Sequence, residues 1–466
     1  MPESLDYTPR SAWRLFSGAG EHEKMMDFAR AYIDFISLCK TERECVAQIR
    51  KRLLDASFSG DCTLQNGRFF RELRGKTLFA ARKGRRPLGD GLALIAAHVD
   101  SPRLDLKQRP LVENGEFVLA KTHYYGGLRK YQWLALPLAL HGVIIGESRK
   151  RIDVRIGEEP DDPQFCIADL LPHLAQKQNE QKVSEAFEGE KLNIILAHGD
   201  PEGADAGEAD SRDRGKGIKN CLLRLLHEKY GICEEDLVSA ELEAVPAGRA
   251  RLLGFDRSMV GGYGQDDRIC AYTALEAFAA VEDPEYCSAL IFWDKEEIGS
   301  DGATGASSRF LQYCIEELAR KWQPGCPAGE IMLASRALSA DVQAGLDPDF
   351  QDLHDAQNAA RLGFGPCFSK YTGSRGKYGS SDADAEFFGE LRSLFNKKGL
   401  PWQAAELGKV DSGGGGTVAL FLAALGMQVI DLGPALLSMH SPFEISSCAD
   451  IYATWLCYRA FLEGRA

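Results

Sequence analysis

The sequence predicts an α/β fold in which an inserted, mostly β domain interrupts an open sheet. Gly91–Ala97 and Ser288–Trp293 are short apolar runs that end at polar residues, as buried strands of open α/β sheets do. Between these two runs the pattern changes to short β-like segments with few chemically reactive side chains. A chain of 466 residues is long enough for two or three domains. We therefore expect a host domain of residues 1–102 and 247–466, with residues 103–246 inserted.

Helical and strand-like patterns predict the elements in order. Apolar residues near a period of 3.6 predict helix from Glu21 to Asp55 and again from Ile269 to Val281. Ser441, Pro442 and Glu444 fit a capping box, which predicts a long C-terminal helix starting there. The acidic, Gly-rich stretch 199–217 predicts a solvated loop. The expected strands of the insertion are Phe117–Leu119, Gly142–Ile145, Arg151–Ile156 and Leu192–Leu196.

Composition excludes several classes of protein. Hydrophobic residues make up 44% and charged residues 26%, as in ordinary globular proteins. With 55 Lys and Arg against 68 Asp and Glu, the net charge of -13 argues against nucleic-acid binding. The longest uncharged apolar run, Tyr131–Gly146, is shorter than the roughly 20 residues that a membrane span needs. No signal peptide is visible and the 13 cysteines form no CxxC pair, so we expect a cytoplasmic protein with free thiols.

Acidic and imidazole side chains stand at several predicted strand ends and helix starts. His98 and Asp100 are two residues apart, so on extended backbone they face the same side, and Asp100 could orient His98 as a metal ligand. The alternative is an ordinary hydrogen bond between a strand-end His and a loop Asp. Asp266 and Asp267 precede a helix, where one Asp would serve as a cap and a second could bridge two cations.

Three further positions have both a chemical and an ordinary interpretation. Glu296 and Glu297 are adjacent carboxylates, of which one could bind a metal while its neighbour moves a proton; the alternative is a solvated acidic turn. Asp341 follows an apolar segment and could be a ligand or a turn residue. His440 precedes the predicted capping box and could be a ligand or a packed polar residue.

The types of candidate ligand indicate which metal ions the site would bind. Two histidines and several carboxylates, without cysteine, suit Zn, with Co or Mn as alternatives. The carboxylates of Asp266, Glu297 and Asp341, with a hydroxide, would balance two divalent cations. The Gly-rich run Asp411–Thr417 lacks the Gly-Lys-Ser/Thr ending of a phosphate loop, so it more simply lets the backbone pass close to a substrate or a neighbouring strand.

Taken together, these motifs resemble those of the M18 metalloaminopeptidases, a family that includes aspartyl aminopeptidase and vacuolar aminopeptidase I. The matching strings are Ala-His98-Val-Asp100-Ser-Pro, Gln-Asp266-Asp-Arg, Asp-Lys-Glu296-Glu297-Ile-Gly-Ser, Ser-Ala-Asp341 and Met-His440-Ser. The resemblance implies two metal ions held by His98 and Asp341, by Glu297 and His440, and by Asp266 between them. It implies that Glu296 is the general base for a metal-bridging water and that Asp100 orients His98. Asp267 directly follows Asp266, so either carboxylate could be the one that bridges the two metal ions.

The resemblance also implies an architecture and an assembly. The expected catalytic domain is zinc-peptidase-like, with a doubly wound mixed sheet, and the insertion is a dimerisation domain. A homo-oligomer, a dodecamer built from dimers, is implied. Pro172-His173-Leu matches a family motif, so His173 would reach a neighbouring subunit's site and stabilise the oxyanion; the alternative is an ordinary surface histidine.

Two alternatives exist for the P1 residue of the substrate, an acidic one and a neutral one. The segment Ser374-Arg375-Gly-Lys377-Tyr resembles the specificity region of aspartyl aminopeptidase, where Arg375 or Lys377 would meet an acidic P1 side chain; a neutral P1 residue is the alternative. The sequence thus predicts a di-metal aminopeptidase that removes single N-terminal residues from peptides. The other hypotheses are a di-zinc amidohydrolase of the carboxypeptidase or deacylase type and a non-catalytic assembly protein.

Overall fold

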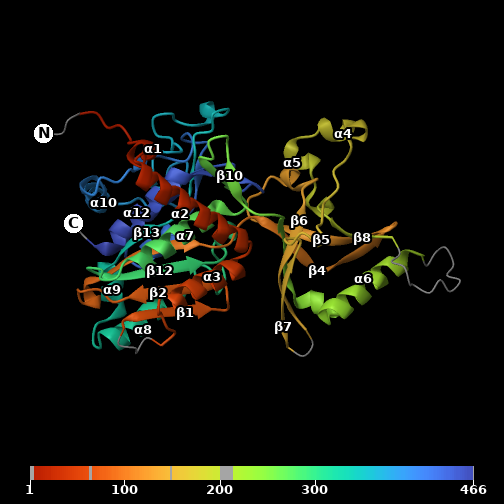
Figure 1. Ribbon diagram of the computed structural model, residues 1–466, viewed down its shortest axis with the longest axis horizontal. Coiled ribbons are helices and arrows are strands. Elements are labelled where there is room, and N and C mark those ends of the chain that lie inside the picture. Colours follow the sequence, from red (N-terminus) through yellow and green to blue (C-terminus); the bar gives the residue numbers. More distant parts are fainter. Residues whose placement is uncertain (1–4, 62–65, 147–148, 200–213, 465–466) are drawn as a thin grey trace. The chain divides into compact units, whose positions relative to one another are not determined.

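The computed structural model describes residues 5–61, 66–146, 149–199 and 214–464 (Figure 1). The chain divides into two compact units. The first unit comprises Met1–Ser101, Ala250–Met439 and Phe443–Ala466, and the second comprises Pro102–Arg249 with His440–Pro442. Each unit is described separately below.

The first unit is built on an eight-stranded mixed sheet. Its strand order is β1-β2-β12-β3-β13-β19-β15-β17. The central strands β12, β3, β13 and β19 run parallel, whereas β1, β2 and β15 pair antiparallel with their inner neighbours. The two predicted apolar runs are confirmed as β3 and β12. The strands are β1 Arg68–Leu73, β2 Thr77–Arg82, β3 Leu92–His98, β12 Cys287–Trp293, β13 Arg336–Ser339, β15 Cys367–Ser369, β17 Gln403–Ala404 and β19 Gln428–Gly433.

Apolar side chains leave this sheet on both faces, because successive residues of a strand point to opposite sides. On β3, Leu94 and Ala96 belong to one buried cluster, whereas Ile95 and Ala97 belong to another. The first cluster includes residues of α8 (Phe310–Trp322), α9 (Ala328–Ala334) and α11 (Ala419–Ala424). The second includes residues of α1 (Ala12–Leu15), α2 (Ala19–Leu38), α3 (Glu42–Asp55), α7 (Gln265–Ala280), α10 (Ala385–Lys397) and α12 (Cys448–Glu463). The sheet therefore lies between two helical layers.

The predicted helix from Glu21 to Asp55 is two helices, α2 and α3. Thr41 ends the break between them: its hydroxyl accepts from the Glu44 N–H at 3.2 Å, and the Glu44 carboxylate accepts from the Thr41 N–H at 3.1 Å. This capping box starts a new helix, so the apolar periodicity continues across a break in the helical backbone at Cys39 and Thr41.

The predicted capping box at Ser441 and Glu444 is wrong. Glu444–Ser447 forms strand β21, and α12 begins at Cys448. Strand β21 lies in a five-stranded sheet of order β10-β11-β21-β20-β14, and its pairing with two neighbouring strands replaces the helical turn. The other strands are β10 Arg251–Leu253, β11 Met259–Gly262, β14 Gln343–Ala344 and β20 Ala435–Leu437.

The second unit contains a six-stranded antiparallel sheet of order β7-β6-β9-β4-β5-β8. The four strand-like segments expected in the insertion fall within or overlap β5, β6, β7 and β8. A helix, α6 (Arg214–Tyr230), is also present, so the final part of the predicted 199–217 loop is helical; residues 200–213 lie outside the described residues. The strands are β4 Arg103–Asn114, β5 Phe117–Tyr125, β6 Leu138–Ile145, β7 Arg151–Ile156, β8 Ile194–His198 and β9 Glu241–Pro246, and the short helices are α4 Gln176–Asn179 and α5 Val183–Ala186.

Among the described residues, no helix combines the length and the apolar character that crossing a membrane requires.

Candidate metal centre

Acidic side chains and one histidine converge where the parallel strands of the first unit end. His98 is the last residue of β3, and Asp341 follows β13. Glu296 and Glu297 lie in a single 3-10 turn, η6 (Glu296–Ile298), directly after β12. Asp266 and Asp267 open helix α7. Carboxyl ends of neighbouring parallel strands meet at one edge of a sheet, which is where open α/β folds place their sites.

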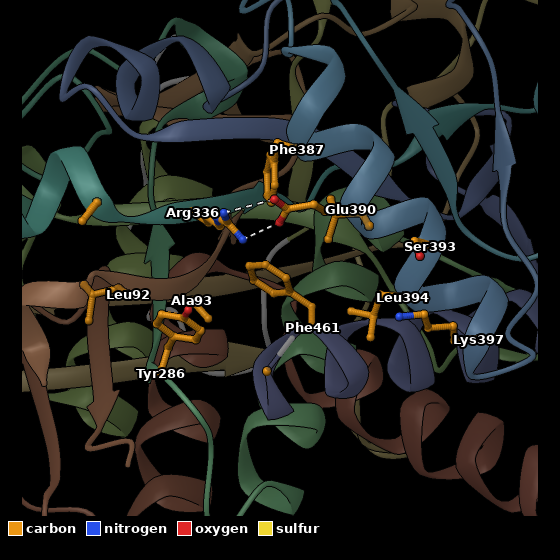
Figure 2. Close-up of a pocket in the computed structure, with 13 residues that line it drawn as sticks. Leu92, Ala93, Tyr286, Arg336, Phe387, Glu390, Ser393, Leu394, Lys397 and Phe461 are labelled. Atoms are coloured by element: carbon orange, nitrogen blue, oxygen red, sulfur yellow. Dashed lines mark hydrogen bonds and ion pairs between the residues drawn. The ribbon is translucent and has the colours of Figure 1, made fainter. Parts of the chain in front are cut away.

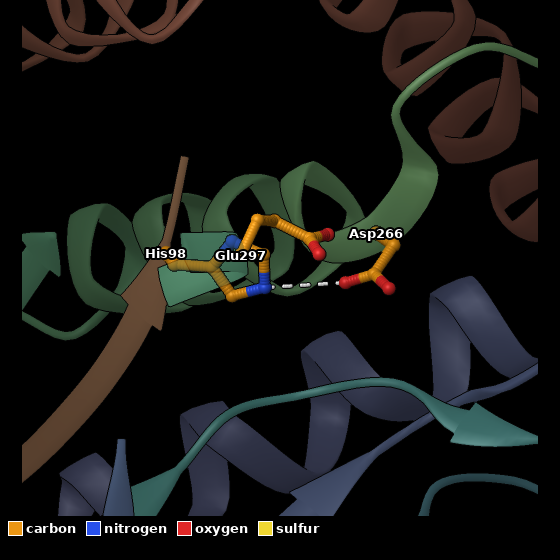
Figure 3. A group of neighbouring side chains, drawn as sticks. All are labelled: His98, Asp266 and Glu297. Carbon is orange, nitrogen blue, oxygen red and sulfur yellow. Dashed lines mark ion pairs between the residues drawn. The ribbon is translucent and has the colours of Figure 1, made fainter. Parts of the chain in front are cut away.

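The His98 ring lies close to two of the carboxylates. Its Nε2 lies 3.2 Å from Asp266 Oδ1 and 4.0 Å from Glu296 Oε2. One ligand atom each from His98, Asp266 and Glu297 lie within 4.8 Å of one another, and in Figure 3 these three side chains point toward a common centre. A second group with the same spacing is formed by His98, Asp267 and Asp341. Nitrogen and oxygen donors at this spacing match a site for zinc or a similar divalent ion.

Asp100 connects the histidine to the glutamate turn. The Nδ1 atom of His98 lies 3.3 Å from Asp100 Oδ1 and 3.1 Å from the Asp100 carbonyl oxygen. The two carboxylate oxygens of Asp100 also accept the backbone N–H groups of Glu296 and Glu297, each at 3.2 Å. One fully buried carboxylate thus orients both the imidazole and the turn that carries two candidate reactive groups.

Residues that the sequence did not identify hold the start of α7. Glu444 Oε2 accepts the backbone N–H groups of Gln265 at 2.6 Å and Asp266 at 3.2 Å. Arg268 is fully buried and donates to the Val99 carbonyl, between His98 and Asp100. Its guanidinium fills the space beside Gly264, where a Cβ atom would lie 1.9 Å from Nη1. Arg268 belongs to the string Gln-Asp-Asp-Arg and Glu444 lies far from it in the sequence, so no local pattern indicated these contacts.

The buried carboxylates of the cluster favour binding of a cation. Burial, with the neighbouring carboxylates of Asp267 and Asp266, raises the pKa of Asp341 well above its ordinary value. Burial also raises the pKa of Asp267, and Asp266 adds to the increase. For His98, burial alone lowers the pKa, but hydrogen bonds with Asp100 and Asp266 raise it well above the ordinary value. Buried carboxylates around one imidazole repel one another without a countercharge, so this donor set fits divalent metal ions.

The remaining predicted ligand, His440, belongs to the second unit. Its Nδ1 lies 2.9 Å from the Gly127 carbonyl oxygen, which can only accept a hydrogen bond. Nδ1 therefore carries the proton, and Nε2 carries the lone pair that binding a metal requires. Its role as a ligand stays a prediction.

Three other predicted residues lie on exposed segments. His173 is exposed in the 3-10 turn η3 (Pro172–Leu174) of the second unit. Arg375 and Lys377 are exposed and have positive φ values of 50° and 66°. Lys377 Nζ pairs with Asp382 at 2.9 Å and lies 3.7 Å from the centre of the Tyr371 ring. Their proposed roles toward a neighbouring subunit or a substrate stay predictions.

The Gly-rich run Asp411–Thr417 lies close to a neighbouring strand, which is the second of the two roles expected for it. Gly414–Gly415 forms strand β18, which pairs with β16 (Gly373–Ser374). A Cβ atom at Gly414 would lie 2.1 Å from the Gly373 carbonyl oxygen. The glycines therefore let two backbone segments approach closely.

A separate cavity of about 270 Å³ lies near the opposite edge of the sheet. Leu92, which begins β3, and Arg336, which begins β13, line it (Figure 2). Arg336 is paired there with Glu390 at 2.5 Å. The lining contains no histidine and one carboxylate, so the metal-binding chemistry belongs to the other edge.

Comparison with known proteins gives consistent results. The family model described as Aminopeptidase I zinc metalloprotease (M18) matches residues 35–462. A probable M18 family aminopeptidase 1 of Clostridium acetobutylicum is 44% identical over 99% of this chain and 100% of its own length. The corresponding protein of Thermotoga maritima is 46% identical over 95% of this chain and 96% of its own length.

Solved structures resemble the whole chain. The crystal structure of an M18 aminopeptidase from Thermotoga maritima has a TM-score of 0.90 at 44% identity, covering 98% of this chain and 100% of that one. Aminopeptidase I from Clostridium acetobutylicum has a TM-score of 0.89 at 42% identity, with the same coverage. The Saccharomyces cerevisiae mApe1 dodecamer shares the fold, with a TM-score of 0.74 at 22% identity over 94% of this chain and 97% of that one.

Proposed function

Because the chain belongs to the M18 family of zinc metalloproteases and is an M18 aminopeptidase, we propose that it removes single N-terminal residues from peptides with two metal ions bound at the candidate centre. The observation that carries this proposal is the convergence of His98, Asp266 and Glu297 to within 4.8 Å of one another. Zinc fits the nitrogen and oxygen donors, with Co or Mn as alternatives.

The proposed ligands divide between two ions. His98 and Asp341 would hold one, which agrees with their common membership of the second ligand group. Glu297 would hold the other together with His440, whose assignment rests on the Met-His440-Ser motif and on its protonated Nδ1. Asp266 would bridge them, since its Oδ1 lies 3.2 Å from His98 Nε2, whereas Asp267 Oδ2 accepts the backbone N–H of His98 at 3.4 Å.

Proton transfer is assigned to Glu296. When bound, the metal ions would polarise the scissile carbonyl and lower the pKa of the attacking water. The Glu296 carboxylate would take the proton of that water and deliver it to the leaving amine. Two features support this role: its Oε2 lies 4.0 Å from His98 Nε2, and Asp100 fixes its backbone N–H. The side chain is 18% exposed, as access of water and substrate to the base requires.

The proposal also covers assembly and location. We propose a homo-oligomer, a dodecamer built from dimers through the second unit, in which His173 enters a neighbouring subunit's site and stabilises the oxyanion. The exposed side chains of Leu171 and Leu174, 48% and 68% exposed, flank His173 and offer apolar area for such a contact. Among the described cysteines, all of which are free, nothing requires an oxidising compartment, so we place the enzyme in the cytoplasm.

The P1 preference depends on which cation meets the substrate. Both side chains are exposed, but Lys377 is already paired with Asp382, whereas within the described residues Arg375 forms no ion pair. We therefore propose Arg375 as the better candidate for an acidic P1 side chain. A neutral P1 residue is the alternative if neither cation reaches the substrate.

The first test is hydrolysis of aminoacyl-p-nitroanilides of Asp, Glu, Leu, Lys and Ala, with added Zn, Mn or Co and with a chelator control. Chelator-sensitive release supports the proposal, and preference for Asp and Glu that is lost in Arg375→Gln supports the acidic pocket. Release from Leu or Ala keeps the mechanism and refutes acidic specificity. Cleavage of N-acetylated peptides would favour the amidohydrolase, and no release from any substrate would favour the non-catalytic protein.

The second test separates proton transfer from metal binding. Glu296→Gln should lower kcat by roughly 10²–10⁴-fold while the metal content stays unchanged. Glu330→Gln, at an exposed position in α9, is the matched control and should keep full activity. Near-normal activity of Glu296→Gln would refute its assignment as the base.

A further inference from the structure

A basic groove of about 900 Å³ runs along one face of α10 in the first unit. Its lining includes Arg10, Lys370, Arg392 and Lys397, against a single acidic residue, Asp6. The whole chain has more acidic than basic residues and a net charge of -13. Positive charge gathered in one hollow of an acidic protein creates a local field that attracts anions.

Most of this positive charge is not neutralised by the protein. Lys370, Arg392 and Lys397 are exposed, and within the part of the chain that the structure describes their side chains form no ion pair. Basic residues close by behave differently: Arg336 pairs with Glu390 at 2.5 Å and Lys398 with Glu463 at 2.7 Å. Three positively charged side chains in the groove are therefore available to bind a ligand.

Arg10 and a pair of aromatic side chains, Trp402 and Tyr7, also line the groove. Arg10 Nη2 donates to the Leu400 carbonyl oxygen at 2.6 Å, which holds this guanidinium at the wall. Trp402 is buried, at 8% exposed, and its Nε1 donates to Asn396 Oδ1 at 2.9 Å. Tyr7 stacks on Trp402 with a centroid distance of 5.3 Å and an interplanar angle of 25°, and remains 58% exposed. An aromatic ring that is anchored on one neighbour and still exposed is a platform for stacking a planar ring.

We propose that this groove binds a nucleoside polyphosphate, with the phosphates on Lys370, Arg392 and Lys397 and the base against Tyr7. A singly charged metabolite would leave two of the three cations without a partner, whereas a polyphosphate engages all of them. A nucleic acid would meet the net negative charge of the remaining surface. None of the candidate metal ligands lines the groove, so this site is separate from the candidate metal centre and does not rest on the proposed peptidase mechanism.

The location suggests what binding would affect. Ser393 and Lys397 line both this groove and the apolar cavity of Figure 2, so α10 borders the two hollows. Arg336 in that cavity begins β13, and Asp341 follows the end of the same strand. A ligand on α10 therefore contacts a helix whose Glu390 pairs with Arg336, at the start of the strand that leads to Asp341.

Isothermal titration calorimetry of the full chain tests the proposal, with ATP, inorganic triphosphate and adenosine as probes. The protein is kept metal-free, since ATP chelates divalent ions. We expect ATP to bind more tightly than triphosphate, and triphosphate more tightly than adenosine. Loss of a single charge-assisted hydrogen bond weakens binding by about tenfold, so the variant with Lys370→Gln, Arg392→Gln and Lys397→Gln should bind ATP at least about tenfold more weakly.

The controls make each outcome decisive. A variant with Lys51→Gln, Arg109→Gln and Lys321→Gln changes the net charge equally at exposed positions outside the groove and should bind ATP normally. Tyr7→Leu should weaken ATP binding several-fold and leave triphosphate binding unchanged. Equal losses in both triple variants, loss of binding in Asp341→Asn, or no ATP binding at all would overturn the proposal. Equal affinity for ATP and triphosphate would overturn the assignment of the base to Tyr7.

Discussion

Glu444 offers a test of how the protein holds the Asp266 backbone. One oxygen, Oε2, accepts two N–H groups, from Gln265 at 2.6 Å and from Asp266 at 3.2 Å. Both residues are almost inaccessible to solvent, at 0% and 3% exposed. In Glu444→Ala, water cannot readily replace the lost acceptor. At about 1–3 kcal/mol for each buried donor left unsatisfied, we expect the free energy of unfolding to fall by roughly 2–6 kcal/mol.

Glu444→Gln removes the negative charge but keeps a hydrogen-bond acceptor, so it tests the two contributions separately. Its amide oxygen can take the place of Oε2 and keep both bonds, but the bonds become neutral. Hydrogen bonds to charged groups contribute about 1.5–3 kcal/mol and neutral ones about 0.5–1.5, so we expect a loss of roughly 2 kcal/mol for the pair. Because the same backbone presents the proposed bridging carboxylate, zinc affinity should fall as well, by roughly 10–100-fold in the Ala variant.

Urea denaturation of the metal-free protein, followed by circular dichroism, measures stability, and competition with a chromophoric chelator measures zinc affinity. Glu23→Gln, an exposed change in α2 beyond its first turn, is the control and should alter neither quantity. The reasoning fails if the Ala and Gln variants are equally unstable. It also fails if the Ala variant loses stability while its zinc affinity is unchanged, because Glu444 would then support the fold without positioning Asp266.

Three other predictions follow from the structure. A chelator should lower the melting temperature in differential scanning fluorimetry and added zinc should restore it, because the buried carboxylates of the cluster lose their countercharge; an unchanged melting temperature would contradict this. Burial raises the pKa of Asp450 from its ordinary 3.8 to about 7, against the opposing N–H groups of Gly363 and Gly365, so stability on the order of 4 kcal/mol should be lost as the pH rises from about 4 to 7. Urea midpoints at pH 5 and pH 8 should show this slope, and its persistence in Asp450→Asn would refute the assignment. Inactive His173→Ala and Glu296→Gln proteins, dissociated and reassembled together, should recover partial activity, whereas no recovery would argue against action between subunits.

Strand positions could be predicted from the sequence because the signal is local. The apolar runs of β3 and β12 end at polar residues, which marks the strands and places His98, Glu296 and Glu297 at one sheet edge. The break at Thr41 was equally local, since Thr41-Glu-Arg-Glu44 is itself a capping box. The apolar periodicity continues across the break, however, and predicts a single helix.

Glu444 could not be assigned from the sequence because its partners are distant. Ser441-Pro-Phe-Glu444 satisfies the local rule for a helix start. In the structure, however, Glu444 pairs with Gly262 across β11 and β21, and its carboxylate accepts from Gln265 and Asp266. Contacts between residues about 180 positions apart leave no periodic signal, so a correct local pattern led to the wrong element.

The adjacent aspartates of α7 illustrate what geometry adds to a motif. From the sequence, either Asp266 or Asp267 could be the bridging carboxylate. In the structure, Asp266 Oδ1 faces the His98 ring nitrogen at 3.2 Å, while Asp267 is fully buried and its Oδ2 accepts the His98 backbone N–H at 3.4 Å. A carboxylate that faces the imidazole and the Glu297 side chain can share an ion with both. Asp267 binds the backbone of the neighbouring strand and also offers a ligand atom to the second group, with His98 and Asp341. The two aspartates therefore differ in their positions in the cluster and are not redundant.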